Sequence, residues 1–484
     1  MDETPRHRSG GRAGRQAARA QRQVERLPFL TRKLAPYELL DEEGLSLLEE
    51  NADTILQEVG LEFRGDPEAI RLLRDAGADV QGERVRFERG MCRRIVQATA
   101  PRQFTQHARN PANSVEIGGP HTVFAPNYGS PFVRDLDNGR RYGTIEDFRN
   151  FVKLAYLSPH LHHSGGTVCE PVDVPVNKRH LDMVYSHIRY SDKPFMGSVT
   201  APERAADTVE MARLLFGAEF VDARTVVISL INANSPLVWD ATMLGALRTY
   251  AAANQATIVT PFILAGAMAP VTIAGALVEQ NAEALFGLAL TQLVRPGAPC
   301  MYGGFTSNVD MKSGAPAFGT PEYMKAAIIG GQLARRYNVP YRTSSTNAAN
   351  AVDAQAGYET VFSLWGAIMG GGNFIIHTAG WMEGGLVASF EKFALDVELL
   401  QTVTEFLKPV SGDVGGDCWP LISDRRDHQQ WTLAGRPDAA QAANRLWKQA
   451  LAEYELPPLD PAIAEELDAF VARRIAEGGE PTDF

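Results

Sequence analysis

The sequence predicts an α/β fold: a (β/α)8 TIM-type barrel with a helical and β-stranded lead-in before it and a helical extension after it. Two observations carry this prediction. Short apolar runs alternate with helical segments at regular spacing, and most of the runs end in a polar or glycine-rich turn. Such alternation predicts a parallel sheet, and about seven or eight units predict closure into a barrel. No GxGxxG or GxxxxGK[ST] motif follows the first predicted strand, which disfavours an open doubly wound sheet.

Residues 339–383 form the clearest β–α–β unit of the chain. Val339–Thr343 is short and β-branched, Ala354–Met369 has apolar residues at helical spacing, and Asn373–Thr378 is a second short apolar run. We expect the two strands to be parallel neighbours. Because the carboxyl ends of parallel strands carry ligands, we expect a site at Ser344–Asn350 and Thr378–Glu383.

Composition narrows the class of protein. The 484 residues are 45% apolar and 22% charged, as in a globular protein with a sizeable core. A net charge of −11 disfavours nucleic acid as a partner. The four cysteines are widely spaced without a CxxC pair, and no secretory signal opens the chain, so we expect a cytoplasmic protein. The uncharged stretch Ala256–Val278 contains Pro261, Gly266 and Pro270, and we interpret it as a strand, a loop and the start of a helix rather than a membrane span.

We divide the chain into four parts. Residues 1–33 are arginine-rich with few apolar side chains and predict a flexible basic tail, with docking to an acidic partner and organelle targeting as open alternatives. Residues 34–143 predict two helices, Asp41–Val59 and Asp66–Ala76, followed by a β insertion with an Asp-Asn-Gly hairpin turn. Thr144 is a predicted helix N-cap and opens the barrel, residues 144–410, which the helical extension 411–484 follows.

Within the barrel we predict strands separated by helices. The predicted strands are His160–Val168, Phe195–Val199, Thr225–Ile231, Ala256–Leu264, Pro299–Gly304, Pro340–Thr343 and Asn373–Thr378. The predicted helices include Ala201–Phe216, Trp239–Ala253, Ile273–Leu293, Pro321–Tyr337 and Ala354–Met369.

Aromatic residues join the polar turns that follow these strands. On a barrel the turns converge on one mouth. The aromatic candidates there are Tyr128, Trp239, Phe262, Phe305, Tyr358 and Trp381. Aromatic faces suit a quaternary ammonium group, because it cannot donate a hydrogen bond and is held by cation–π attraction of about 0.5–2 kcal/mol per ring. For each ring the alternative is packing in the core.

Histidines are the remaining candidates for chemistry. His160 and His162 would share one face of a strand and His163 the other, and no cysteine or carboxylate lies at ligand spacing, so we expect no metal site. His377 ends a late strand, where it could donate to an anionic group of a substrate or be satisfied by a backbone carbonyl. Asp353 is a predicted N-cap of the helix after it.

Several stretches resemble one known family. LAPYELLDEEGL, NVDMKSG, GTPEYMKA, DAQAGYE and GWMEGGLVASFEKFALDVELL are similar to the trimethylamine–corrinoid protein methyltransferases, from about Leu34 to Leu407. The resemblance implies a (β/α)8 barrel that moves a methyl group from an amine to cob(I)alamin carried by a separate corrinoid protein. Archaeal members have pyrrolysine a few residues before DAQAGYE, where this chain has Thr346. It therefore resembles the non-pyrrolysine branch that demethylates glycine betaine and related quaternary amines, in which a histidine matching His377 is a carboxylate ligand.

From the residues and the resemblance together we expect a corrinoid-dependent methyltransferase acting on a small quaternary amine, glycine betaine above others. We expect no catalytic acid or base, no metal, no cofactor bound tightly to this chain and no membrane, and we expect a homo-oligomer. The alternatives are an enzyme for another methylated amine, a betaine-binding or regulatory protein without turnover, and a zinc-dependent methyltransferase. The predicted substrate-binding residues are His377, Thr346, Asn347, Trp381, Phe305, Tyr128 and Phe262, supported by Asp353, Gln355 and Glu383.

Overall fold

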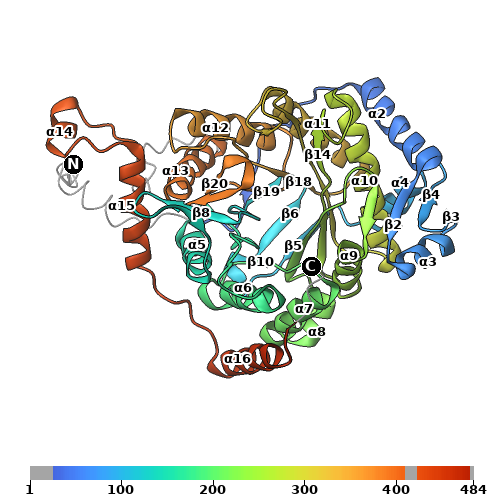
Figure 1. Ribbon diagram of the computed structural model, residues 1–484, viewed down its shortest axis with the longest axis horizontal. Coiled ribbons are helices and arrows are strands. Elements are labelled where there is room, and N and C mark those ends of the chain that lie inside the picture. Colours follow the sequence, from blue (N-terminus) through green and yellow to red (C-terminus); the bar gives the residue numbers. More distant parts are fainter. Residues whose placement is uncertain (1–25, 409–421, 480–484) are drawn as a thin grey trace, which may run out of the picture.

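A curled sheet of eight strands forms the centre of the computed structural model, which describes residues 26–408 and 422–479 (Figure 1). Seven strands run parallel, each hydrogen-bonded to the next, and β1 (Leu30–Thr31) is antiparallel to the first of them. In spatial order the seven are β7 (His121–Phe124), β19 (Phe374–Ile376), β18 (Tyr341–Ser344), β15 (Cys300–Gly303), β13 (Ala256–Val259), β11 (Val227–Ile231) and β10 (Phe195–Met196). The predicted mixed α/β fold with a parallel sheet is confirmed.

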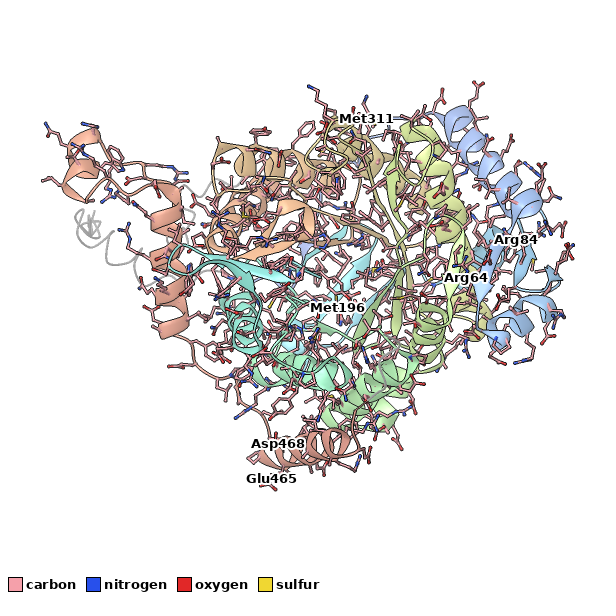
Figure 2. The ribbon with its side chains drawn as sticks, viewed as in Figure 1. Arg64, Arg84, Met196, Met311, Glu465 and Asp468 are labelled. Atoms are coloured by element: carbon pink, nitrogen blue, oxygen red, sulfur yellow. The ribbon has the colours of Figure 1, made fainter. Side chains whose placement is uncertain are left out.

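Helices separate consecutive strands along the chain and lie around the sheet (Figure 1). They are α5 (Ile145–Leu157), α6 (Val176–Tyr190), α7 (Pro202–Phe216), α8 (Ala218–Ala223), α9 (Ala241–Ala252), α10 (Ile273–Val294), α11 (Pro321–Tyr337), α12 (Ala354–Met369) and α13 (Phe390–Leu407). Figure 2 shows Met196 of β10 in the middle of the molecule and Arg64, Arg84 and Met311 at its periphery. Clusters of buried apolar side chains from the strands and the helices form the core, as burial of apolar area requires.

The uncharged stretch Ala256–Val278 contains β13, a second strand, β14 (Phe262–Ala265), and the start of α10. Among the described residues, no helix is long and apolar enough to cross a membrane. Strand β15 likewise continues into β16 (Phe305–Val309), which pairs in parallel with β14 and in antiparallel with β17 (Pro316–Ala317). The pairing of β14 with β16 places Phe262 directly beside Phe305.

Two predictions about the sheet were wrong. β7 belongs to the parallel sheet, although it precedes Thr144, where we expected the barrel to begin. The segment 160–168 forms no strand. Its backbone nevertheless links the two edges of the parallel set: His162 N donates to Phe124 O at 3.0 Å, and Met196 N donates to Gly165 O at 2.8 Å.

Side chains take the hydrogen bonds that a regular strand would have made in this segment. Phe124 N donates to His162 Nδ1 at 3.0 Å, and Gly165 N donates to His163 Nδ1 at 2.9 Å. Because these backbone donors are satisfied by imidazole nitrogens rather than by ladder carbonyls, the segment is held in place without strand geometry.

The lead-in forms a small α/β layer on α10. Its elements are α2 (Glu42–Thr54), a π-helical turn (Ile55–Val59), β2 (Leu61–Arg64), α3 (Pro67–Asp75), β3 (Asp79–Gln81), β4 (Arg84–Arg86) and α4 (Met91–Thr99). The hairpin of β5 (Gln103–Gln106) and β6 (Val115–Gly118) lies apart from this layer and packs against the central sheet beside β7. Both predicted helices are present, capped by Asp41 and Asp66. β12 (Val238–Asp240) joins β2 across the lead-in boundary, so the two parts share one core.

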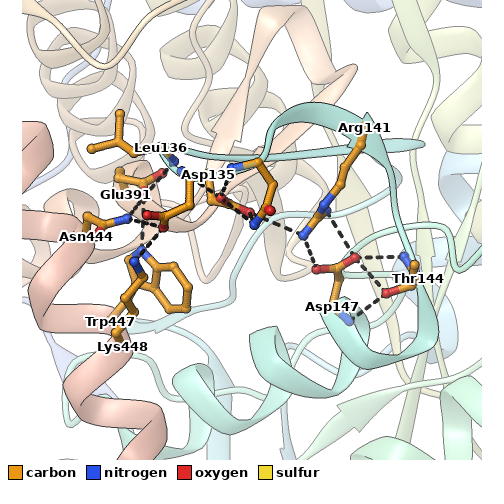
Figure 3. A network of polar contacts seen from close by, with 11 residues as sticks. Asp135, Leu136, Arg141, Thr144, Asp147, Glu391, Asn444, Trp447 and Lys448 are labelled. Atoms are coloured by element: carbon orange, nitrogen blue, oxygen red, sulfur yellow. Dashed lines mark hydrogen bonds and ion pairs between the residues drawn. The ribbon is translucent and has the colours of Figure 1, made fainter.

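The predicted hairpin is confirmed as β8 (Phe132–Asp135) and β9 (Gly139–Tyr142), and Thr144 caps α5 with a capping box. β8 also pairs with β21 (Val387–Ser389), which in turn pairs with β20 (Trp381–Met382). Figure 3 shows the polar network of this region: Arg141 donates to Asp147 at 2.8 Å and to Asp135 at 3.2 Å. The hairpin therefore anchors the segment that follows β19.

The C-terminal extension contains α14 (His428–Leu433), α15 (Ala439–Ala452) and α16 (Pro461–Ala476). Trp447 and Asn444 of α15 both donate to Glu391 of α13, which also accepts from Leu136 N of the β8–β9 turn (Figure 3). Of the predicted flexible tail, residues 1–33, positions 1–25 lie outside the described residues, as do 409–421 and 480–484. The prediction was wrong for the end of that tail, because Leu30–Thr31 pairs with β7 and Arg32 is buried.

We expect Lys193→Met to lower the free energy of unfolding by about 1–3 kcal/mol. The buried Lys193 ammonium donates to the carbonyls of Ala155, Ser158 and Leu161 at 2.6–2.7 Å and so holds the segment before His162. Burial lowers the pKa of Lys193 well below its usual value, so removal of the charge offsets part of the loss. Urea unfolding measures the effect. Lys325→Met, at an exposed position, is the control and should change the free energy of unfolding by less than about 0.5 kcal/mol. Equal stability of the two variants would contradict the prediction.

Candidate functional site

Unpaired polar atoms gather where β18 ends. Ser344, Ser345, Thr346 and Asn347 are buried, and the side-chain oxygen of each has no hydrogen-bond partner within the described part of the chain. Buried polar groups are almost always paired, with protein or with bound water. A run of four unpaired oxygens therefore marks a place that a polar ligand or water completes. It coincides with the predicted loop, and β18, α12 and β19 confirm the predicted β–α–β unit.

Helix α12 holds this loop rigidly. Thr346 N donates to Ser363 Oγ at 2.8 Å, and Ser363 Oγ donates back to Thr346 O at 2.7 Å. Asn347 Nδ2 donates to Thr360 Oγ1 at 3.2 Å and to Trp381 O at 2.8 Å, so this side chain ties the β18 loop to the segment after β19. The amide is thereby fixed with its oxygen left free.

The predicted supporting residues act at different distances from the loop. Asp353 is confirmed as the N-cap of α12 and lies exposed. Gln355 is also exposed and donates to Glu359 Oε1 at 2.8 Å. Glu359 supports the loop directly, because its Oε2 accepts from Ala348 N at 2.8 Å and Ala349 N at 3.1 Å. We had not singled out Glu359, although it closes the DAQAGYE motif.

Glu383 fixes the second loop. Its backbone N donates to Ala349 O at 3.1 Å, and its carboxylate forms an ion pair with Arg140 of β9 at 3.0 Å. The residue has a positive φ of 51°, and the next two residues are glycines that also have positive φ. The tight turn after β20 is thus held by both the β18 loop and the hairpin.

Aromatic rings form a cluster beside the two loops. Phe318, Tyr323 and Trp381 are buried, whereas Phe262 and Phe305 remain partly exposed. Phe305 lies at the centre: its ring centroid is 5.2 Å from that of Phe262 and 5.6 Å from that of Phe318. Because Phe262 and Phe305 retain accessible surface, they can offer ring faces to a ligand. Trp381 is buried and packs in the same cluster.

His377 joins this cluster. It directly follows β19 with a φ of 63°, and its backbone N donates to Pro126 O at 3.0 Å. The imidazole stacks on Trp381 at 4.9 Å between centroids and lies 5.5 Å from Phe305, and its Nδ1 is buried without a partner. Burial, and next the neighbouring Arg342 charge, hold the pKa of His377 well below its usual value, so the ring is neutral at pH 7.

Arg342 is a site residue that the sequence analysis missed. It lies on β18 with 1% of its surface exposed, and its guanidinium carbon is 5.3 Å from the centre of the Phe305 ring. Its Nε and Nη1 are buried and make no hydrogen bond to the described residues. Burial lowers the pKa of Arg342 to about 10, which leaves the side chain charged at pH 7. One signal was present: Arg342 is the single charged residue in the strand that enters the polar loop.

Tyr128 lies near His377 because β7 and β19 are neighbours, so the segments that follow them are also adjacent. The Tyr128 backbone acts to raise the pKa of His377, an effect smaller than the opposing effects of burial and of the Arg342 charge. Burial raises the pKa of the Tyr128 phenol to about 12, so it is neutral. Neutral groups and one cation, Arg342, therefore border this part of the site.

Other candidates from the sequence lie elsewhere. Trp239 packs in the main core against Phe286, 5.3 Å between centroids, and is not a site residue. Tyr358 is 62% exposed and lines a surface groove that α12 shares with α13. His162 accepts from the backbone as described above, and His163 Nε2 is 3.1 Å from Gln106 Oε1, so both serve the fold. No group of three potential metal ligands was found within residues 26–408 and 422–479.

Comparisons with known proteins identify relatives of this chain. The family model described as trimethylamine methyltransferase (MTTB) matches residues 8–415 and 418–479. The chain is 40% identical to the glycine betaine methyltransferase of Desulfitobacterium hafniense (strain Y51) over 92% of this chain and 99% of that protein. It is 28% identical to the proline betaine:corrinoid methyltransferase of Eubacterium limosum over 73% and 74% of the two chains. It is 25% identical to the trimethylamine methyltransferase MttB of Methanosarcina barkeri (strain Fusaro / DSM 804), over 86% and 91%. The solved monomethylamine methyltransferase (MtmB) of Methanosarcina barkeri aligns with a TM-score of 0.48 at 10% identity, over 93% of this chain and 97% of that one.

We expect Phe305→Ala to weaken binding of a small quaternary ammonium ion by about 0.5–2 kcal/mol, because one partly exposed ring is removed. Trp381→Ala should weaken this binding by a similar amount, because it removes one aromatic ring and also the surface on which the His377 imidazole stacks. Titration calorimetry with tetramethylammonium measures both effects. Tyr358→Ala serves as the control and should bind as the unmodified protein does. If Phe305→Ala and Trp381→Ala are folded and retain full affinity, these rings belong to the core alone.

Proposed function

This chain belongs to the trimethylamine methyltransferase (MTTB) family, and we propose that it transfers a methyl group from a small quaternary amine to a corrinoid protein. Glycine betaine is the proposed substrate. Two relatives support it by name, the glycine betaine methyltransferase and the proline betaine:corrinoid methyltransferase. Thr346, where pyrrolysine occurs in the resembling archaeal enzymes, argues against trimethylamine.

The observation that carries the proposal is the junction of two unlike surfaces in one buried site. Phe262 and Phe305 offer aromatic faces, which suit a quaternary ammonium group. Unpaired polar atoms lie beside them, at Arg342, His377 and the β18 loop. Arg342 and the loop hydroxyls can donate to an acceptor, so a ligand with a cation at one end and a hydrogen-bond acceptor at the other suits both surfaces, and glycine betaine has this form.

The chemistry fits a site without an acid or base. A tertiary amine must be activated before it loses a methyl group, whereas a quaternary ammonium already carries the positive charge and leaves as a neutral amine. The corrinoid, carried by its own protein, supplies the nucleophilic cobalt as the second substrate. The residues of this chain then need only orient the N–CH3 bond and exclude water. The rigid loops described above suit that task.

We further infer that the sheet is a (β/α)8-type barrel in which residues 161–166 take the place of the eighth strand. The hydrogen bonds of His162 and Gly165 to both edges of the parallel set support this inference. Cys92, Cys169 and Cys300 are free and buried, which suits a reducing cytoplasm. The homo-oligomer stays a prediction.

We expect glycine betaine to be demethylated and trimethylamine not to be. The purified protein is mixed with a reduced cob(I)alamin protein and each amine, and the cobalt absorption spectrum is followed toward the methylated form. Choline and dimethylglycine complete the panel. Rapid turnover of trimethylamine with no response to betaine would contradict the proposal. Binding of betaine without turnover of any amine would instead favour a betaine-binding protein.

We expect His377→Ala to weaken glycine betaine binding by roughly 10- to 100-fold, the equivalent of about 1.5–3 kcal/mol for a hydrogen bond to a charged group. Choline has no carboxylate, so its affinity should stay nearly constant. Calorimetry with both ligands measures the difference, and His377→Gln should restore part of the betaine affinity because it returns a donor. If choline weakens as much as betaine, His377 is a structural histidine.

A further inference from the structure

The chain buries a guanidinium group without giving it a counter-ion. Arg342 is 1% exposed, and no hydrogen bond or ion pair joins its side chain to the described residues. The groups that act to raise its pKa, against the larger effect of burial, are the phenols of Tyr323, Tyr341 and Tyr128, and these are not ionised at pH 7, so none is a counter-ion there. A buried charge without a partner costs several kcal/mol, so such a residue is retained where something else supplies the opposite charge.

Other buried cations of the described chain differ from Arg342. Lys193 donates to three carbonyls, and Lys392 forms a buried ion pair with Asp396. Arg32, at 8% exposure, donates to the carbonyls of Pro120, Gly119 and Ile368. Burial alone therefore does not leave a cation unsatisfied in this fold. Among these buried cations, only Arg342, within β18 beside the site residues, lacks such partners.

We propose that Arg342 is the counter-ion of the substrate's carboxylate and that it selects zwitterionic betaines over carboxylate-free quaternary amines. This inference rests on the proposed function and names the residue that sets its substrate class. Arginine suits the role because its planar donor array matches a carboxylate and because it stays charged when buried. His377 lies beside Arg342 and is neutral, so it can help to orient the carboxylate by a hydrogen bond, whereas Arg342 supplies the opposite charge.

The placement of Arg342 fixes the orientation of such a ligand. Its guanidinium carbon lies 5.3 Å from the Phe305 ring centre, and the His377 ring lies 5.5 Å from the same ring. A carboxylate bound between Arg342 and His377 thus lies next to the Phe305 ring. The ammonium end then points toward the remaining aromatic surface, at Phe262, and away from the Arg342 charge, which would repel it.

The test uses two variants and four ligands of similar shape. Glycine betaine carries both charges, choline only the cation, 3,3-dimethylbutanoate only the carboxylate and 3,3-dimethylbutanol neither. Calorimetry measures each ligand on the unmodified protein, Arg342→Gln and Arg342→Lys. Arg335→Gln, which removes an exposed cation from the far end of α11, is the matched control and should bind all four ligands as the unmodified protein does.

We expect Arg342→Gln to bind both carboxylate ligands roughly 10- to 100-fold more weakly and to leave choline and dimethylbutanol unchanged. Arg342→Lys keeps the charge without the planar array and should show a smaller loss, confined to the same two ligands. If Arg342→Gln fails to fold, the lysine variant decides by the same ligand pattern. The thermal midpoint of ligand-free Arg342→Gln should stay level or rise, because an unpaired buried charge is removed, whereas a structural arginine would lower it.

The outcomes separate this inference from the proposed function. If the unmodified protein demethylates betaine while the Arg342 variants bind all four ligands normally, the inference is overturned and the function stands. If no quaternary amine is demethylated but dimethylbutanoate still depends on Arg342, the function fails and Arg342 remains the anion site. A uniform loss across all four ligands would make Arg342 a structural residue.

Discussion

The cost of burying charge is the constraint on which the site depends. This fold satisfies Lys193 with three carbonyls and Lys392 with a carboxylate, yet leaves Arg342 unpaired beside a loop of unpaired oxygens. The unpaired arrangement is tolerable only because the surroundings are rigid: α12 fixes the loop through Ser363, Thr360 and Glu359. The scaffold is thus preorganised around groups that it does not itself satisfy, and the ligand completes them.

The local elements of the fold could be predicted from the sequence because local physics dictates them. Helix caps at Asp353 and Thr144, the Asp-Asn-Gly hairpin and the 339–383 unit follow from side-chain hydrogen bonds and apolar periodicity within a few residues. Strand membership was harder. β7 belongs to the sheet through its pairing with β19, some 250 residues later, which no local pattern reveals. Residues 160–168 have a strand-like composition. The imidazole nitrogens of His162 and His163, however, accept hydrogen bonds from backbone N–H groups of β7 and of this segment, in place of strand carbonyls.

The site divides in the same way. Topology alone brings the ends of β18 and β19 together, so the positions of Thr346, Asn347 and His377 could be expected. Which rings face a ligand depends on packing between distant segments: Phe262 and Phe305 meet through a strand register, whereas Trp239 packs on Phe286 in the core. Arg342 was missed because an arginine in a strand is ordinarily solvent-facing or paired. Only the three-dimensional contacts show that it is neither.

The charges of the site also explain how it can favour methyl loss without an acid or base. In the proposed complex, betaine brings its own carboxylate to offset Arg342, so the filled site would hold the guanidinium, the carboxylate and the ammonium in alternation. Removal of a methyl cation leaves a neutral amine. The carboxylate stays paired with Arg342 throughout, so the interaction of Arg342 with the ligand is the same before and after methyl transfer. The charge that disappears in this step is that of the ammonium group, which the aromatic rings hold only by cation–π attraction of about 0.5–2 kcal/mol per ring. Such a site binds the substrate by its unreacting end and leaves the N–CH3 bond to the corrinoid, which places specificity and reactivity on different groups.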